Sequence, residues 1–185
     1  MAGRVCPPWV GWLLINPLRK LLENPDTILG PFVQEGMIVL EPGSGMGYFT
    51  LPLARMVGPK GRVVAVEIQP KMLSVLDRRA RKAGLLERIE LRHAGAGGLG
   101  VEDLSEAVDL AAAIHMVHEL PDQASFFAEI RKALKPEGKL LVIEPKGHVS
   151  LDRFEQTVAV AEKISFKRET LPGKASGRCA LFSKP

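Results

Sequence analysis

Five short apolar runs, separated by stretches with helical periodicity, place the strongest constraint on how this chain can fold. They are Ile38 to Leu40, Val63 to Val66, Ile89 to Leu91, Leu110 to Ile114 and Leu140 to Ile143. None of them alternates apolar with polar residues. Each run therefore predicts a strand that is buried on both faces, as strands are in a parallel sheet.

Helices are expected after three of these runs, over Phe49 to Val57, Pro70 to Ala83 and Pro121 to Leu134. Strands that alternate with helices of this length favour right-handed crossovers. Farther along, Asp152 to Lys163 predicts a helix, and Ser165 to Leu171 with Arg178 to Ser183 predicts an antiparallel hairpin around a Pro172–Gly173 turn. The sequence thus predicts a single α/β domain with a Rossmann-like, doubly wound, mostly parallel sheet and an antiparallel C-terminal edge hairpin.

The segment Glu41-Pro42-Gly43-Ser44-Gly45-Met46-Gly47 joins the first predicted strand to the helix that begins near Tyr48. Alternate glycines let the backbone turn sharply and approach a ligand with no Cβ in the way. Open α/β sheets bind ligands at the carboxyl ends of their strands, where backbone N–H groups and a helix N-terminus can face the ligand. The segment is therefore interpreted as a cofactor loop.

The ligand of this loop is narrowed by its neighbours. A dinucleotide fingerprint would need glycine where Tyr48 stands, and no Gly-Lys-Ser/Thr of a P-loop follows. Glu67 ends the second predicted strand, where an acid can accept both ribose hydroxyls of NAD or S-adenosylmethionine. A tight turn without a ligand is the alternative, and the three glycines together with Glu67 argue against it.

On these residues the chain resembles the class I S-adenosylmethionine-dependent methyltransferases, over about residues 36 to 145. That family carries acid-x-Gly-x-Gly-x-Gly in its first loop, matched here by Glu41, Gly43, Gly45 and Gly47. The resemblance implies that residues 43–47, including Ser44, surround the methionine part and that Glu41 orients its amino group, directly or through water. It also implies that Glu67 binds the ribose and that Ile68 lies beside the adenine.

The chain departs from the family after the third predicted strand. Members often carry an acid there that bonds the adenine amine, whereas this chain has no acid from His93 to Gly98. Backbone groups of Ala94, Gly95 and Ala96 are left to frame the adenine. One hydrogen bond fewer would weaken cofactor binding by about 0.5–1.5 kcal/mol.

Two histidines after the fourth predicted strand, His115 and His118, are the predicted catalytic residues, and His115 is also a predicted cofactor contact. Methyl transfer needs an aligned nucleophile, and a general base only where the acceptor must lose a proton. A structural role is the competing interpretation, and it is the stronger one for His118. A metal ion would need a third ligand, for which only Glu119 or His93 is suggested, so no metal is predicted.

Residues 1–35 are predicted to form a helical lid ahead of a methyltransferase domain over residues 36–185. The lid carries large apolar side chains that need a partner, among them Trp9 and Trp12. Packing on the sheet or on a homodimer partner is the alternative to covering the cofactor. The apolar run from Trp9 to Ile15 is too short to span a bilayer, so no membrane partner is predicted.

Composition favours a small-molecule substrate. The net charge of +4 is mild and aromatic residues are 5%, so no nucleic-acid platform is evident. Two cysteines far apart in the sequence, Cys6 and Cys179, fit a reducing cytoplasm. The leading hypothesis is methyl transfer from S-adenosylmethionine to a small-molecule acceptor. Methylation of RNA or protein, and a non-catalytic protein that binds the cofactor, are the alternatives.

Overall fold

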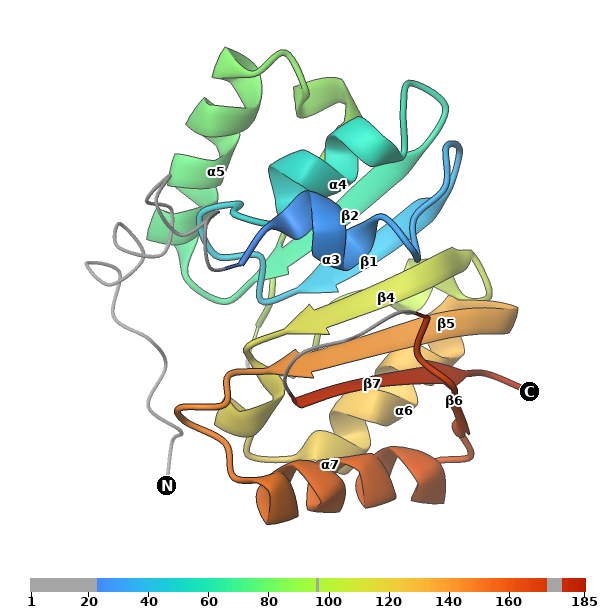
Figure 1. Cartoon of the computed structure of the whole chain (residues 1–185). Coiled ribbons are helices and arrows are strands. Elements are labelled where there is room, and N and C mark those ends of the chain that lie inside the picture. Colours follow the sequence, from blue (N-terminus) through green and yellow to red (C-terminus); the bar gives the residue numbers. More distant parts are fainter. Residues whose placement is uncertain (1–22, 96, 173–177) are drawn as a thin grey trace. The chain divides into compact units, whose positions relative to one another are not determined.

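The computed structural model describes residues 23–95, 97–172 and 178–185, which fall into two compact units, residues 23–100 and residues 101–185 (Figure 1). Ala96, Gly173 and the apolar part of the predicted lid before residue 23 lie outside the described residues. No helix in the described ranges is long and apolar enough to cross a membrane.

The N-terminal unit is built on three parallel strands in the order β3-β2-β1. Its elements are α3 (Pro25–Leu29), β1 (Ile38–Pro42), α4 (Thr50–Met56), β2 (Arg62–Glu67), α5 (Pro70–Lys82), η1 (Leu86–Arg88) and β3 (Ile89–His93). The register pairs Glu41 with Ala65 and Glu67 with His93, so the carboxyl ends of the three strands meet at one edge. Helix α5 packs against β2 and β3, and α4 packs against β2.

Strands β1 and β2 are buried on both faces, as predicted from runs that do not alternate apolar with polar residues. Val39, Leu40, Val63 and Val64 are fully buried, on successive positions of β1 and β2. Strand β3 lies at the end of the strand order and is only half-buried along most of its length. The predicted helix over residues 70–83 is confirmed as α5, which carries Pro70 in its first turn, where a missing N–H costs nothing.

The C-terminal unit has four strands in the order β4-β5-β7-β6. Its elements are η2 (Glu102–Leu104), β4 (Val108–Ile114), η3 (Val117–Glu119), α6 (Gln123–Ala133), β5 (Leu134–Glu144), α7 (Leu151–Lys163), β6 (Lys167–Glu169) and β7 (Arg178–Ser183). Strands β4 and β5 are parallel, and β7 pairs antiparallel with both β5 and β6. The predicted antiparallel C-terminal hairpin is confirmed, with β6 shorter than the run that predicted it.

Side-chain caps explain where the two long helices of this unit begin. Asp122 Oδ1 accepts the Ser125 N–H at 3.0 Å, and Asp122 Oδ2 accepts the Ser125 hydroxyl at 2.7 Å, so α6 starts after Asp122 rather than at Pro121. Ser150 caps α7 in the same way, through the Arg153 N–H at 3.2 Å. Each cap satisfies a helix donor that has no partner within the helix.

Candidate functional site

The glycines of the loop between β1 and α4 all have left-handed backbones, with φ of +74° at Gly43, +56° at Gly45 and +84° at Gly47. They serve different ends. A Cβ at Gly47 would collide with Leu76 of α5, so this glycine lets the helix approach the loop. A Cβ at Gly45 would meet nothing nearer than Met72 Sδ at 3.9 Å, so the surface of Gly45 is open. Gly45 is therefore the glycine beside which a ligand has room.

The loop is tied to the carboxyl end of β2 through its own backbone amides. The N–H groups of Gly43 and Ser44 both donate to the Val66 carbonyl, at 2.8 and 3.1 Å, and the Gly45 N–H donates to Glu67 Oε2 at 2.9 Å. We expected amides of this loop to face a ligand, but these three are used by the protein. What the loop offers a ligand is the surface at Gly45, where no side chain stands in the way.

Glu67 ends β2 and is buried, with 6% of its surface exposed. One of its oxygens accepts the Gly45 N–H, and the other accepts the Gln69 N–H at 2.9 Å. These two bonds orient the carboxylate at the strand end. Because each carboxylate oxygen has two lone pairs, Glu67 keeps the capacity to accept two further hydroxyls.

Glu41 is the most unusual group of this unit. It is 3% exposed, and its Oε2, like the hydroxyls of Ser44 and Thr50, has no hydrogen-bond partner among the residues that the structure describes. Burial raises the pKa of Glu41 to about 8, and the charge of Glu67 adds to this rise, while the nearby Thr50 hydroxyl offsets part of it. A buried carboxyl oxygen without a partner is costly unless a ligand supplies one.

The stretch after β2 lies beside the end of β3. The His93 ring donates to the Ile68 carbonyl at 3.0 Å, and the Ala94 N–H donates to the Glu67 carbonyl at 3.0 Å. The Ile68 side chain is 49% exposed, which is uncommon for a large aliphatic residue. These contacts bring together the predicted ribose and adenine residues within one unit.

The turn after β3 is narrow. Gly95 forms an isolated antiparallel bridge with Gly98, and the predicted contact Ala96 between them lies outside the described residues. The roles of Ala94, Gly95 and Ala96 beside the adenine stay predictions.

Arg79 of α5 is a loop contact that the sequence reasoning missed. Its guanidinium donates to the Met46 carbonyl of the glycine loop, and burial lowers the pKa of Arg79. Met46 also packs with Met72 and Val75 of α5. The signal was present, because position 79 lies in the apolar stripe of the helix, where a charged residue needs a specific partner.

His115 follows β4 in the C-terminal unit. Its N–H donates to the Ile143 carbonyl at 2.7 Å, and its φ of +58° is unusual for a residue other than glycine. Such a backbone costs on the order of 1–3 kcal/mol, and strain of this kind is concentrated at functional sites. Its predicted contact with cofactor or substrate stays a prediction.

His118 of η3 is held by Glu144 at the end of β5. The main-chain N–H of His118 donates to Glu144 Oε1 at 2.8 Å, and its ring Nδ1 lies 2.6 Å from Glu144 Oε2. The other ring nitrogen, Nε2, is 4.0 Å from Glu119 Oε1, and the His148 ring centroid is 6.4 Å from that of His118. Nowhere in the described ranges do three His, Cys, Asp or Glu residues converge as metal ligands.

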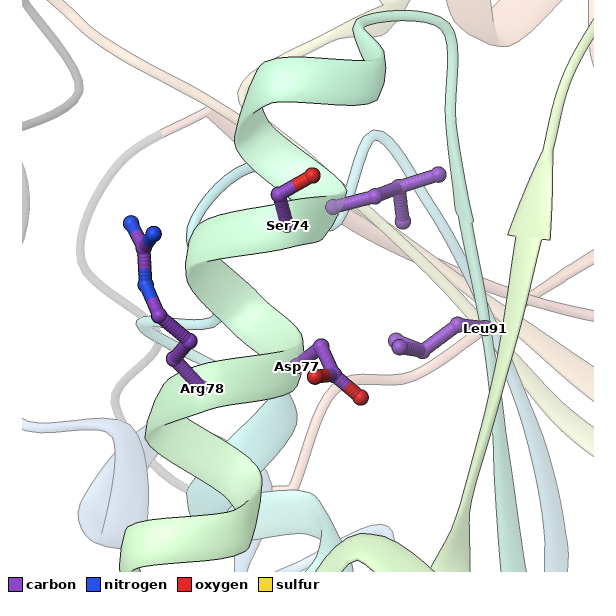
Figure 2. Close-up of a pocket in the computed structure, with 5 residues that line it drawn as sticks. Ser74, Asp77, Arg78 and Leu91 are labelled. Carbon is purple, nitrogen blue, oxygen red and sulfur yellow. The ribbon is translucent and has the colours of Figure 1, made fainter.

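The N-terminal unit also has a hollow beside α5 and β3. It is lined by Leu73, Ser74, Asp77 and Arg78 of α5 and by Leu91 of β3, and Figure 2 shows Arg78 extending from the side of the helix opposite to Leu91. None of the predicted site residues lines this hollow.

The chain is similar in sequence to known methyltransferases. The family described as "Methyltransferase domain" matches residues 33–176. A demethylmenaquinone methyltransferase from Lactobacillus johnsonii is 31% identical over 112 residues, 60% of this chain and 45% of that protein. A ubiquinone/menaquinone biosynthesis C-methyltransferase UbiE from Marinomonas sp. is 29% identical over 162 residues, 88% of this chain and 62% of that protein. The chain thus spans about half the length of the first relative and somewhat more of the second.

Among solved structures, a SAM-dependent methyltransferase from Aquifex aeolicus superposes with a TM-score of 0.83 and 24% identity. The match covers 97% of this chain and 98% of that one. The likeness confirms the predicted Rossmann-like α/β fold.

Proposed function

The chain belongs to the methyltransferase-domain family, and from this premise we propose that it transfers a methyl group from S-adenosylmethionine to a small-molecule acceptor. The observation that carries the proposal is Glu41, a buried carboxyl whose Oε2 lacks a partner within the described residues, beside a glycine loop with an open surface. Without a ligand the raised pKa keeps a proton on Glu41 at neutral pH, and a bound cationic amino group would stabilise the ionised carboxylate in its place.

The residues proposed to hold the cofactor all lie in the N-terminal unit, apart from His115. The methionine part is assigned to Glu41, Gly43, Ser44, Gly45 and Gly47, the ribose to Glu67, and the adenine to Ile68, Ala94, Gly95 and Ala96. Three observations support a fit. Glu41 Oε2 is left without a partner by the described part of the chain, Glu67 has unused acceptor capacity, and Ile68 exposes an aliphatic surface on which a planar base can lie.

S-adenosylmethionine supplies, when bound, a sulfonium methyl group whose carbon–sulfur bond breaks with its electron pair remaining on sulfur. The chain's own task is to hold the reactants and to manage protons. We propose His118 as the group that accepts a proton from the acceptor and His115 as a contact to cofactor or substrate. Both assignments are predictions that rest on position after β4 and on side-chain chemistry.

The names of the curated relatives put a quinone-like ring first among candidate acceptors, because one of them is a demethylmenaquinone methyltransferase. RNA or protein methylation and cofactor binding without catalysis are the other candidates. We also propose that the protein is cytoplasmic and has no nucleic-acid partner. The lid over residues 1–35 and the homodimer stay predictions.

Calorimetric titration with S-adenosylmethionine and S-adenosylhomocysteine tests the cofactor. Binding with a Kd well below about 1 mM is expected, and no binding by either compound would refute the proposal. Gly45→Leu should abolish binding by filling the open surface. Gly84→Leu is the matched control, since Gly84 has a similar φ of +65° and a Cβ there meets no atom within 4 Å.

Transfer of a labelled methyl group tests the acceptor. Reduced demethylmenaquinone, an RNA fraction and a protein fraction are offered in parallel. Label in the quinol supports the proposal, label in RNA or protein favours the second candidate, and tight cofactor binding without transfer favours a non-catalytic protein.

A further inference from the structure

Glu144 is a buried carboxylate whose two oxygens both bond to one residue, His118. Strands β4 and β5 run in register at their carboxyl ends, where Ile114 pairs with Ile143, so the segment after β4 passes beside Glu144. Glu144 is 2% exposed, and its two oxygens receive the main-chain N–H and the ring Nδ1 of His118. Bracing the turn would need only the main-chain bond, so the ring contact calls for a separate explanation.

The donor and acceptor inventory decides which ring nitrogen of His118 carries hydrogen. The main-chain N–H can only donate, and an ionised carboxylate can only accept, so Nδ1 must be the N–H of the ring. A neutral imidazole has one N–H, which leaves Nε2 with a lone pair. The His118 side chain is 16% exposed, so the ring is largely packed but keeps some contact with solvent.

We propose that Glu144 is a positioning residue that holds His118 in the Nδ1–H tautomer, so that Nε2 accepts a proton from the hydroxyl of a phenol or enol acceptor. The tautomer follows from the contacts of this unit alone, whereas the acceptor class rests on the proposed methyltransferase function. The same arrangement gives the imidazolium a counter-charge, because Glu144 stays beside Nδ1 when Nε2 is protonated.

The proton balance of methyl transfer fits an acceptor of this class. The hydroxyl proton moves to Nε2, and the oxygen keeps the electron pair that forms the new bond to carbon. If a ring carbon conjugated to that oxygen is methylated instead, the hydrogen on that carbon leaves afterwards and the hydroxyl is restored. One proton is released in either case. A thiolate or a neutral amine attacks without prior loss of a proton and would not need this base.

Glu144→Gln separates positioning from bracing. The amide oxygen can accept the main-chain N–H of His118, but its NH₂ group then faces Nδ1 and requires Nδ1 to be the acceptor. The ring should therefore switch to the Nε2–H tautomer, which has no lone pair at Nε2. Replacing the orienting carboxylate by an amide in a Ser-His-Asp triad lowers kcat about 10⁴-fold for the same reason.

Nitrogen-15 NMR of the imidazole rings tests the tautomer in the full chain without cofactor. Neutral His118 is expected as Nδ1–H in the native protein and as Nε2–H in Glu144→Gln, while Glu162→Gln, an exposed carboxyl of α7, serves as the control and should change nothing. A native ring in the Nε2–H form, or the same tautomer in the native protein and Glu144→Gln, would overturn the inference. Should Glu144→Gln fail to fold, the native spectrum alone decides.

Kinetics with reduced demethylmenaquinone add the chemical readout. Glu144→Gln should lower kcat by roughly 10²–10⁴-fold with little change in KM. His118→Asn keeps a donor toward Glu144 but has no Nε2, so it should lose the same activity while the fold remains. Native kcat in His118→Asn would overturn the base. Absence of S-adenosylmethionine binding would refute the proposed function, and the tautomer measurement would still decide the position of the proton.

Discussion

Glu41 at the end of β1 gives the sharpest test of the site, through Glu41→Gln and the pH dependence of stability. The carboxyl is 3% exposed, and burial raises its pKa from 4.5 to about 8 in the folded chain. The folded state therefore holds a proton on Glu41 that the unfolded state releases above pH 4.5. The contribution of protonated Glu41 to the free energy of unfolding is fully present below pH 4.5 and is lost as the pH rises through about 8.

The size of the effect follows from these two pKa values. Between them, the free energy of unfolding falls by about 1.4 kcal/mol per pH unit because of this one group. From pH 6 to pH 8 the loss is about 2 kcal/mol, since titration is half complete at the upper limit. That is a large part of the 5–15 kcal/mol stability of an ordinary domain.

Urea unfolding of the native protein and of Glu41→Gln at pH 6, 7 and 8 measures this term. The amide that Glu41→Gln introduces is neutral at every pH, so the stability of the variant relative to the native protein should improve by about 2 kcal/mol over the range. Other titrating groups are common to both proteins and cancel. Glu87→Gln, at an exposed position of the same unit, is the control and should change stability by no more than about 0.5 kcal/mol. Parallel pH profiles for the native protein and Glu41→Gln would refute the reasoning.

Further substitutions separate packing from ligand binding. Gly47→Ala should lower the free energy of unfolding by about 2–4 kcal/mol, from backbone strain and a clash with α5, whereas Gly45→Ala should cost only about 1–2 kcal/mol; equal losses in urea unfolding would contradict the distinction. Glu67→Gln should weaken S-adenosylmethionine binding roughly tenfold to a hundredfold by calorimetry, because it removes a charged acceptor, and unchanged affinity would exclude a ribose contact. Lys184→Met should cost about 1–3 kcal/mol, since the Leu134 carbonyl loses the Lys184 ammonium at 2.7 Å; unchanged thermal unfolding would show that the bond contributes little.

Local patterns were enough to predict a run within each strand and the helices α4 to α7, although β5 begins at Leu134, well before the run that predicted it. Apolar runs without alternation identified β1 and β2, and apolar residues at helical spacing identified α5. Both patterns can be recognised along the chain because the burial of a strand or helix determines where apolar residues occur. The helix predicted from Pro121 begins at Gln123 in the structure. There the side chain of Asp122, rather than a proline, sets the first residue of the helix.

The position of Glu41 was predicted from its motif, but the raised pKa of its carboxyl was not. Glu41 and Glu67 both read as ligand-binding acids in the sequence. In the structure, Glu67 is satisfied by two amides of its own unit, whereas Glu41 Oε2 has no partner in the described part of the chain. That difference depends on which backbone atoms surround each carboxyl.

Residue type and spacing along the chain were enough to predict the succession of strands and helices, the glycine loop and the two acids beside it. Tertiary packing was needed to bring Arg79 to the loop, to bond the amides of Gly43 and Ser44 within the protein, and to join Glu144 to His118. Glu144 lies 26 positions from His118, and no local pattern links them. Contacts across that separation exist only once parallel strands place distant residues side by side, and the proton positions that govern chemistry follow from those contacts.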